Sequence, residues 1–155
     1  MLYDNISEWV ASIIGRRLQS VCGLVYVLDV EDIEHPQALQ IIFDGGLLRT
    51  ISCGSDGATL LLRDVPMVES DLGEYGKQII KDISINSIFG DAIDKELCRL
   101  SIIYSETEQG IIGLNFYFSN FVTINVINLG DEINIYREIP NNILNEERIS
   151  FTGLL

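Results

Sequence analysis

The stretch Cys22-Gly-Leu-Val-Tyr-Val-Leu28 begins a series of four short apolar segments, and Cys98-Arg-Leu-Ser-Ile-Ile-Tyr104 begins a similar series about 75 residues later. Short apolar segments separated by turn residues are typical of β-strands. A series that occurs twice predicts two related four-stranded meanders, in repeat halves of approximately 21–63 and 97–136. The later segments are 39–43, 49–53 and 60–62 in the first half, and 114–118, 122–126 and 133–135 in the second.

The N-terminal segment has a different period. Its apolar residues recur at helical spacing, which predicts an amphipathic helix over residues 5–20 with Trp9 on the buried stripe. Asn5 is expected to cap the first turn of this helix. Arg16 and Arg17 are expected in its last turn, where cations favour the helix dipole.

The remaining segments complete the fold prediction. Residues 77–83 predict an extended segment, and residues 84–89 and 143–149 predict short helical turns. Because no flexible linker interrupts the chain, we expect residues 1–155 to form a single domain whose halves share one core. The predicted class is α+β and mainly antiparallel β, with an N-terminal helix and two related four-stranded meanders.

Acidic residues dominate the charge of the chain. It has 23 Asp and Glu against 10 Lys and Arg, a net charge of −13. Phosphate backbones and anionic lipids repel such a chain, so we expect no nucleic-acid partner and no membrane partner. No apolar run reaches the ~18 residues of a spanning helix, and the N-terminal residues lack the bases of a secretory signal. We therefore expect a cytoplasmic location.

The distribution of charge has two interpretations. No base occurs between Arg17 and Arg49 or between Arg99 and Arg137, and both windows coincide with predicted strands. Acids at strand ends keep an apolar β protein soluble and discourage pairing of its sheet edges. The same acids can create a negative field that steers a basic partner onto the protein. The sequence leaves both interpretations open.

Few residue patterns point to catalysis. His35 is the only histidine and precedes a proline, so a zinc site or a Cys–His pair lacks partners. The odd number of cysteines, three, indicates reduced thiols rather than a disulfide framework. Neighbouring carboxylates are frequent, and a carboxylate-based reaction needs two of them to face one cleft. We expect no catalytic residue, no cofactor and no metal ligand.

Three short motifs resemble a loose bacterial family of small acidic proteins of unassigned activity. They are Asp71-Leu-Gly-Glu-Tyr75, Gly110-Ile-Ile-Gly-Leu-Asn-Phe116 and Asn128-Leu-Gly-Asp-Glu132. In that family an N-x-G-D-E turn closes the final hairpin. Similar acidic β proteins accompany polymorphic toxins, including contact-dependent inhibition systems, as immunity proteins. The resemblance covers the C-terminal half and implies such a role, with no family catalytic residue to carry over.

Charge and resemblance together lead to a first hypothesis, a non-enzymatic immunity protein that binds a cognate basic toxin of the nuclease type. Such a protein needs a rigid acidic face for rapid encounter and a few aromatic anchors. Two alternatives stay open: a binding or scaffold module that can self-associate, and a carboxylate-based enzyme. The candidate partner-binding residues are Glu31, Asp32, Glu34, Asp71, Glu74, Tyr75, Glu106, Glu108, Asp131 and Glu132.

Overall fold

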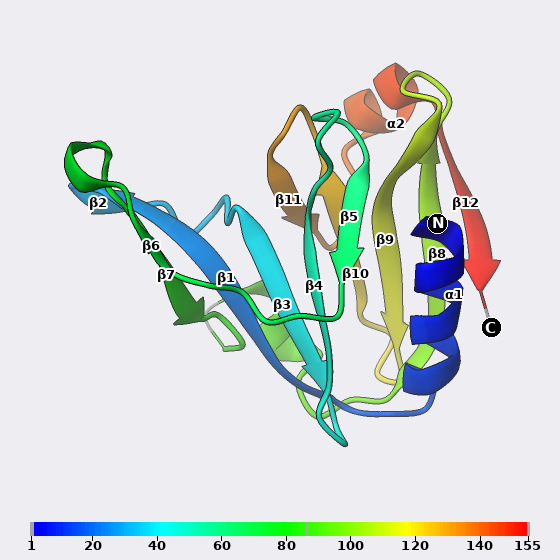
Figure 1. The fold of residues 1–155 in the computed structure, drawn as a ribbon. Helices are drawn as coiled ribbons and strands as arrows, with labels where there is room; N and C mark the ends of the chain where they lie inside the picture. The colour runs from blue at the N-terminus through cyan, green and yellow to red at the C-terminus, as the bar shows by residue number, and fades with distance from the viewer. Residues whose placement is uncertain (1, 86, 155) are drawn as a thin grey trace.

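The computed structural model describes residues 2–85 and 87–154. It contains two antiparallel β-sheets, an N-terminal helix and a short C-terminal helix (Figure 1). The prediction of a mainly antiparallel β fold with an N-terminal helix is therefore confirmed.

The first sheet is built from the first half of the chain. Four of its strands pair in chain order, and a later strand, β7, pairs with the opposite side of β1. Two short strands, β2 and β6, pair with the outer ends of β1 and β7. The strands are β1 (Leu18–Leu28), β2 (Val30–Glu31), β3 (Ala38–Phe43), β4 (Leu47–Cys53), β5 (Leu60–Arg63), β6 (Ser70–Asp71) and β7 (Lys77–Asp82).

The second sheet follows the same order. Four strands again pair in sequence, and a fifth, β12, returns to pair with the free side of β8. Strand β12 was not predicted, because residues 143–149 were assigned to a helical turn and the segment after them to no element. The strands are β8 (Leu97–Ser105), β9 (Gly110–Phe118), β10 (Thr123–Asn128), β11 (Ile133–Tyr136) and β12 (Ile149–Leu154).

The pairing registers show which residues of the two sheets are equivalent. These equivalent residues differ from the ones that the sequence repeat suggested. Leu18 pairs with Phe43 in the first sheet, and Leu97 pairs with Phe118 in the second. In both sheets the register shifts directly after this first pair, in a β-bulge or irregularity. Leu18 and Leu97 therefore hold equivalent positions in the two sheets. The sequence repeat had instead placed Cys22 opposite Cys98.

Helix α1 (Leu2–Ile13) is shorter at its C-terminus than the predicted helix. Gly15 has a φ of 81°, a conformation that suits glycine and ends the helix, so Arg16 and Arg17 lie beyond it. Arg16 still donates its Nε to the Ser12 carbonyl at 2.9 Å and satisfies one of the last helical acceptors. Asn5 lies inside the helix and not at its cap.

The main core joins α1 to both sheets. The Trp9 side chain is fully buried, and its ring lies edge-on to Phe43 of β3 at 6.2 Å and to Phe116 of β9 at 6.0 Å. This geometry is the preferred arrangement for aromatic pairs. The predicted placement of Trp9 on the buried stripe is therefore confirmed, and its indole contacts an aromatic residue of each sheet.

A second, smaller core lies on the outer face of the second sheet. It contains Ile103, Ile112, Ile127 and Ile139, and helix α2 (Asn141–Glu147) covers it with its apolar side chains. Two short 3₁₀ helices complete the fold: η1 (Gly73–Tyr75) lies between β6 and β7 of the first sheet, and η2 (Ile88–Asp91) lies between β7 and β8, where the chain passes from one sheet to the other.

We expect Trp9→Ala to lower the free energy of unfolding by ~3–5 kcal/mol, because it removes a fully buried indole and leaves a cavity between two sheets. Denaturant unfolding followed by circular dichroism measures the change. Tyr3→Ala, on the same helix but half-exposed, is the matched control and should cost far less. Equal costs for the two variants would contradict the central position of Trp9.

Candidate functional site

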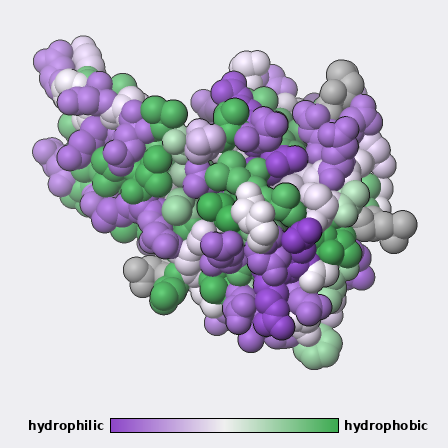
Figure 2. Space-filling view, turned by 60° about the horizontal axis from the view of Figure 1, so that its bottom comes forward, coloured by the Kyte–Doolittle hydropathy of each residue, from purple (hydrophilic) through white to green (hydrophobic). Residues whose placement is uncertain are grey.

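An arm formed by residues 26–34 and 70–78 projects from the body of the protein. It consists of the outer ends of β1 and β7 together with β2, β6 and η1 (Figure 1, upper left). Figure 2 shows the same projection from another direction, with hydrophobic residues exposed among hydrophilic ones. Its two segments are far apart in the sequence and are joined by the pairing of Tyr26 with Gln78 and of Val27 with Lys77.

Specific contacts hold the arm in one conformation. Gly76 has a φ of 95°, and a Cβ at this position would collide with the Val27 carbonyl, so only glycine allows the two segments to approach. The Tyr26 hydroxyl donates to the Tyr75 carbonyl. At the base of the arm, Lys81 forms an ion pair of 2.5 Å with Glu31. The arm is therefore an ordered β structure.

Six of the ten candidate residues lie on this arm. Glu31, Asp32 and Glu34 come from the segment after β1, and Asp71, Glu74 and Tyr75 come from the segment before β7. All of them are exposed except Glu31, which is half-buried beside Lys81. The sequence suggested these two groups separately, and the pairing of β1 with β7 brings them together.

The arm also exposes apolar side chains, of which only Tyr75 was a candidate from the sequence. Val30 is 77% exposed and Tyr75 is 69% exposed, and large parts of Leu28, Ile33 and Leu72 are also accessible. Exposed apolar groups that share a surface with carboxylates are typical of protein-binding sites. The sequence contained one indication of these exposed groups. Leu28 and Val30 continue the alternating apolar residues of β1 beyond the part of β1 that pairs with β3.

Asp131 and Glu132 lie at the junction of the two sheets, at the turn between β10 and β11. The Asp131 amide donates to the Gly57 carbonyl at 2.8 Å and so joins this turn to the turn between β4 and β5. Glu132 Oε1 lies 3.1 Å from His35 Nε2, and Asp32 Oδ1 lies 3.6 Å from His35 Nδ1. His35 thus connects the base of the arm to the second sheet.

Cys53 lies beside this junction. Burial raises the pKa of the Cys53 thiol to about 11, and the negative charges of Asp131 and Glu132 add to the increase. Burial is the larger cause. The thiol is therefore a poor nucleophile at neutral pH, since the thiolate is the reactive form.

Glu106 and Glu108 are not part of the arm. They occupy the turn between β8 and β9, and the Glu106 amide donates to the carbonyl of Arg148, the residue that follows α2. The Glu108 amide donates to Ser105 Oγ at 3.0 Å. Both carboxylates are exposed. The candidate residues therefore form one joint group on the arm, a second group at the sheet junction and a third beside α2.

The carboxylates with shifted pKa values do not have the character of general acids. Hydrogen bonds from Thr59 and Ala58 lower the pKa of Asp56, and hydrogen bonds from Ser84 lower the pKa of Asp82. A general acid at neutral pH requires an upward shift. Among the described residues, no three His, Cys, Asp or Glu side chains are grouped in a way that could hold a metal ion.

Two surface grooves contain pairs of acids, and both also contain bases. One holds Glu8 and Asp64 together with Arg49 and Arg63. The other, at the base of the arm, holds Glu69 and Asp71 together with Lys77. Each groove therefore places its acids beside cations, unlike a cleft in which two carboxylates face each other alone.

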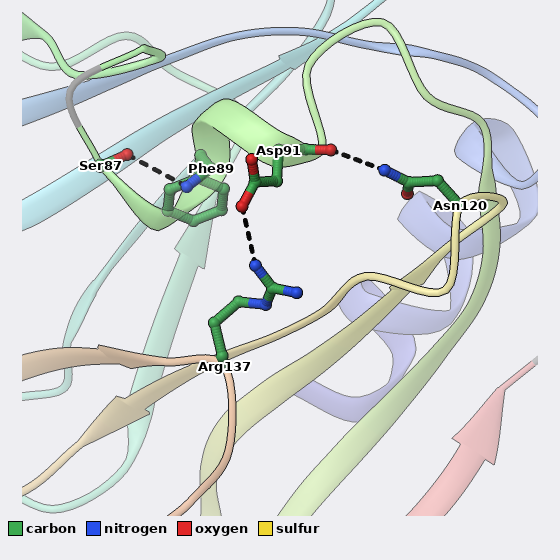
Figure 3. A network of polar contacts seen from close by, with 5 residues as sticks. All are labelled: Ser87, Phe89, Asp91, Asn120 and Arg137. Atoms are coloured by element: carbon green, nitrogen blue, oxygen red, sulfur yellow. Dashed lines mark hydrogen bonds and ion pairs between the residues drawn. The ribbon is translucent and has the colours of Figure 1, made fainter.

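A further polar network stabilises the connection between the sheets (Figure 3). Arg137 donates to Asp91 Oδ2 at 2.8 Å, and Asn120 Nδ2 donates to the Asp91 carbonyl at 2.8 Å. The Ser87 hydroxyl accepts from the amide of Phe89, whose ring is buried in the main core. This network holds η2 against the second sheet.

No helix within residues 2–85 and 87–154 has the length and apolar content needed to cross a membrane. The chain matches no protein-family model, and neither a curated protein nor a solved structure matches it at a significant level. The resemblance of its C-terminal half to small acidic bacterial proteins therefore stays a prediction.

We expect the double variant Asp131→Asn, Glu132→Gln to increase the alkylation rate of Cys53 several-fold at mildly alkaline pH. Removing the two charges lowers the pKa of the thiol and raises its thiolate fraction. Peptide mapping by mass spectrometry after timed iodoacetamide treatment measures the rate. The control Glu106→Gln, Glu108→Gln should leave it unchanged; an equal increase there would argue against a local effect at the junction.

We expect Gly76→Ala to loosen the arm while the cores stay folded, because the added methyl group collides with the Val27 backbone. Hydrogen exchange should accelerate at residues 26–34 and 70–78 and remain slow in β8 and β9. Gly130→Ala is a suitable control, since Gly130 also has a positive φ but has open space around it. Unchanged exchange in the arm would show that Gly76 is not what holds it.

Proposed function

We propose that the chain is a non-enzymatic immunity protein, which binds a basic bacterial toxin of the nuclease type in the cytoplasm and covers its active site. The observation that supports this proposal most is the arm, an ordered projection with both acids and exposed apolar side chains. A projection of this kind suits insertion into a basic cleft that evolved to hold nucleic acid.

Charge supplies the first contribution to the proposed complex. The arm carries Asp29 in addition to its five candidate carboxylates, and its only base is Lys77. Since the net charge of the whole chain is −13, its long-range field also attracts a basic protein. Such complementarity chiefly raises the association rate and reduces binding to wrong partners.

Apolar anchors supply the second contribution. Val30 and Tyr75 protrude on the arm, and each can lose its remaining accessible surface in a complex. Aromatic residues in the centre of an interface often account for much of the binding energy. Because the contacts of Gly76 and Tyr26 already order the arm, binding costs less conformational entropy than it would for a flexible loop.

The proposal also gives a reason for the difference between the two sheets. We infer that both sheets derive from one sheet-forming unit, since strand order, first pair and position of the register shift agree. In the second sheet, β8 and β9 pair as far as Ser105 and Gly110 and meet in a short turn. In the first, β1 continues past its pairing with β3 to form the arm. The specialised function then lies where the copies differ.

Reversing charge on the arm tests the proposal. We expect Asp71→Lys, Glu74→Lys to slow association with the toxin by about tenfold and to weaken its dependence on salt, with folding intact. Stopped-flow or surface-based kinetics measure both, using the toxin encoded next to the gene for this chain. The control Glu106→Lys, Glu108→Lys makes the same change in net charge away from the arm and should have a smaller effect.

Two results would contradict the proposal. Equal slowing by both double variants would place the site outside the arm and leave only a general effect of net charge. Absence of any protein in the gene neighbourhood that binds this chain and is inhibited by it would remove the immunity role itself.

A further inference from the structure

We propose that two copies of the chain associate through strand β12, in an antiparallel pair centred on Phe151 that joins their five-stranded sheets. Strand β12 forms one edge of the second sheet, and no described strand pairs with its outer side. It lies at the right of the molecule in Figure 1, away from the arm at the upper left. The inference is independent of the proposed function, because both surfaces can be occupied together.

The edge of β12 lacks the features with which proteins usually prevent edge pairing. Its six residues, Ile-Ser-Phe-Thr-Gly-Leu, include no charge and no proline. Its register with β8 is regular from Ile149 to Leu154, so no bulge twists it away. An edge strand of this composition is a template for another strand.

The other sheet edges are short or covered. Strands β2 and β6 have two residues each, and both include an acid. The part of β7 that extends beyond β6, Ile79–Asp82, is short and carries Lys81 and Asp82. Strand β5 has four residues and packs against α1. Strand β11 also has four residues and borders a cleft lined by Ile33 and His35. Within the described part of the chain, β12 is therefore the long edge that is open to pairing.

A second copy of β12 fits this edge better than a strand of arbitrary sequence. When Phe151 faces the Phe151 of the other copy, Ser150 faces Thr152, and Ile149 faces Gly153. Aromatic pairs and Ser–Thr pairs are favourable across antiparallel strands. Gly153 has open space where a Cβ would lie, with Ser101 Oγ as the nearest atom at 4.0 Å, so it leaves room for Ile149.

No local charge repulsion opposes self-pairing at this position. In the same register Arg148 faces Leu154, so no two like charges are opposed although each copy carries a net charge of −13. Phe151 is 50% exposed in the single copy and loses that exposure in the pair. Because a two-fold axis relates the strands, association closes at the dimer.

Sedimentation equilibrium over a range of chain concentrations tests the proposal. We expect a monomer–dimer equilibrium with a dissociation constant on the order of micromolar, since one strand pair makes a small interface. Added salt should tighten this dimer, because screening weakens the repulsion between two acidic copies. Toxin binding should respond to salt in the opposite direction, so the two associations are distinguishable.

Two variants examine the register. Phe151→Lys places two ammonium groups opposite each other and should weaken the dimer by about tenfold or more. The control Val68→Lys changes an apolar residue that is 76% exposed between β5 and β6, away from β12, and should leave the dimer intact. Circular dichroism checks that both variants fold.

Opposite charges at position 151 of the two copies test the proposed register most directly. Phe151→Lys mixed with Phe151→Glu should form a heterodimer in native mass spectrometry, since opposite charges then meet at the two-fold axis. A chain that stays monomeric at millimolar concentration, a dimer that Phe151→Lys leaves unchanged, or an assembly larger than a dimer would each overturn the proposal.

Discussion

The contact of the Trp9 indole with Phe43 and Phe116 is the constraint on which the rest of the structure depends. Each sheet packs one face into the main core, where helix α1 lies against both. The indole fills the space between the sheets and sets how they approach each other. Their turns then meet, so that Asp131 reaches Gly57 and Glu132 reaches His35. The arm has a fixed base because this junction is fixed.

The two charge interpretations that the sequence left open correspond to different places in the structure. Glu106 and Glu108 are exposed carboxylates in a turn and have the character of solvated strand-end residues. Acids on β2 and β6 also protect sheet edges. On the arm, the acids share a surface with exposed apolar groups, and solubility alone does not explain that combination. On the function proposed above, one composition serves both purposes.

Much of the fold could be predicted because its strands and turns follow local sequence patterns. Turn residues such as Asp44-Gly45-Gly46 separate β3 from β4, and the predicted segments 39–43 and 49–53 lie within these strands. The end of α1 depends on one positive φ at Gly15, and β12 depends on a partner strand, β8, about 50 residues earlier. The arm was missed for the same reason: its acids were recognised by charge, but only the pairing of β1 with β7 makes them neighbours.

The position of Trp9 has a practical consequence. It is the only tryptophan of the chain, and its ring contacts one aromatic residue from each sheet. Its fluorescence emission is therefore a label-free probe of whether the two sheets are in contact. A change in indole emission during a titration would mean that the ligand alters the interior of the protein, whereas a silent indole would indicate rigid-body docking.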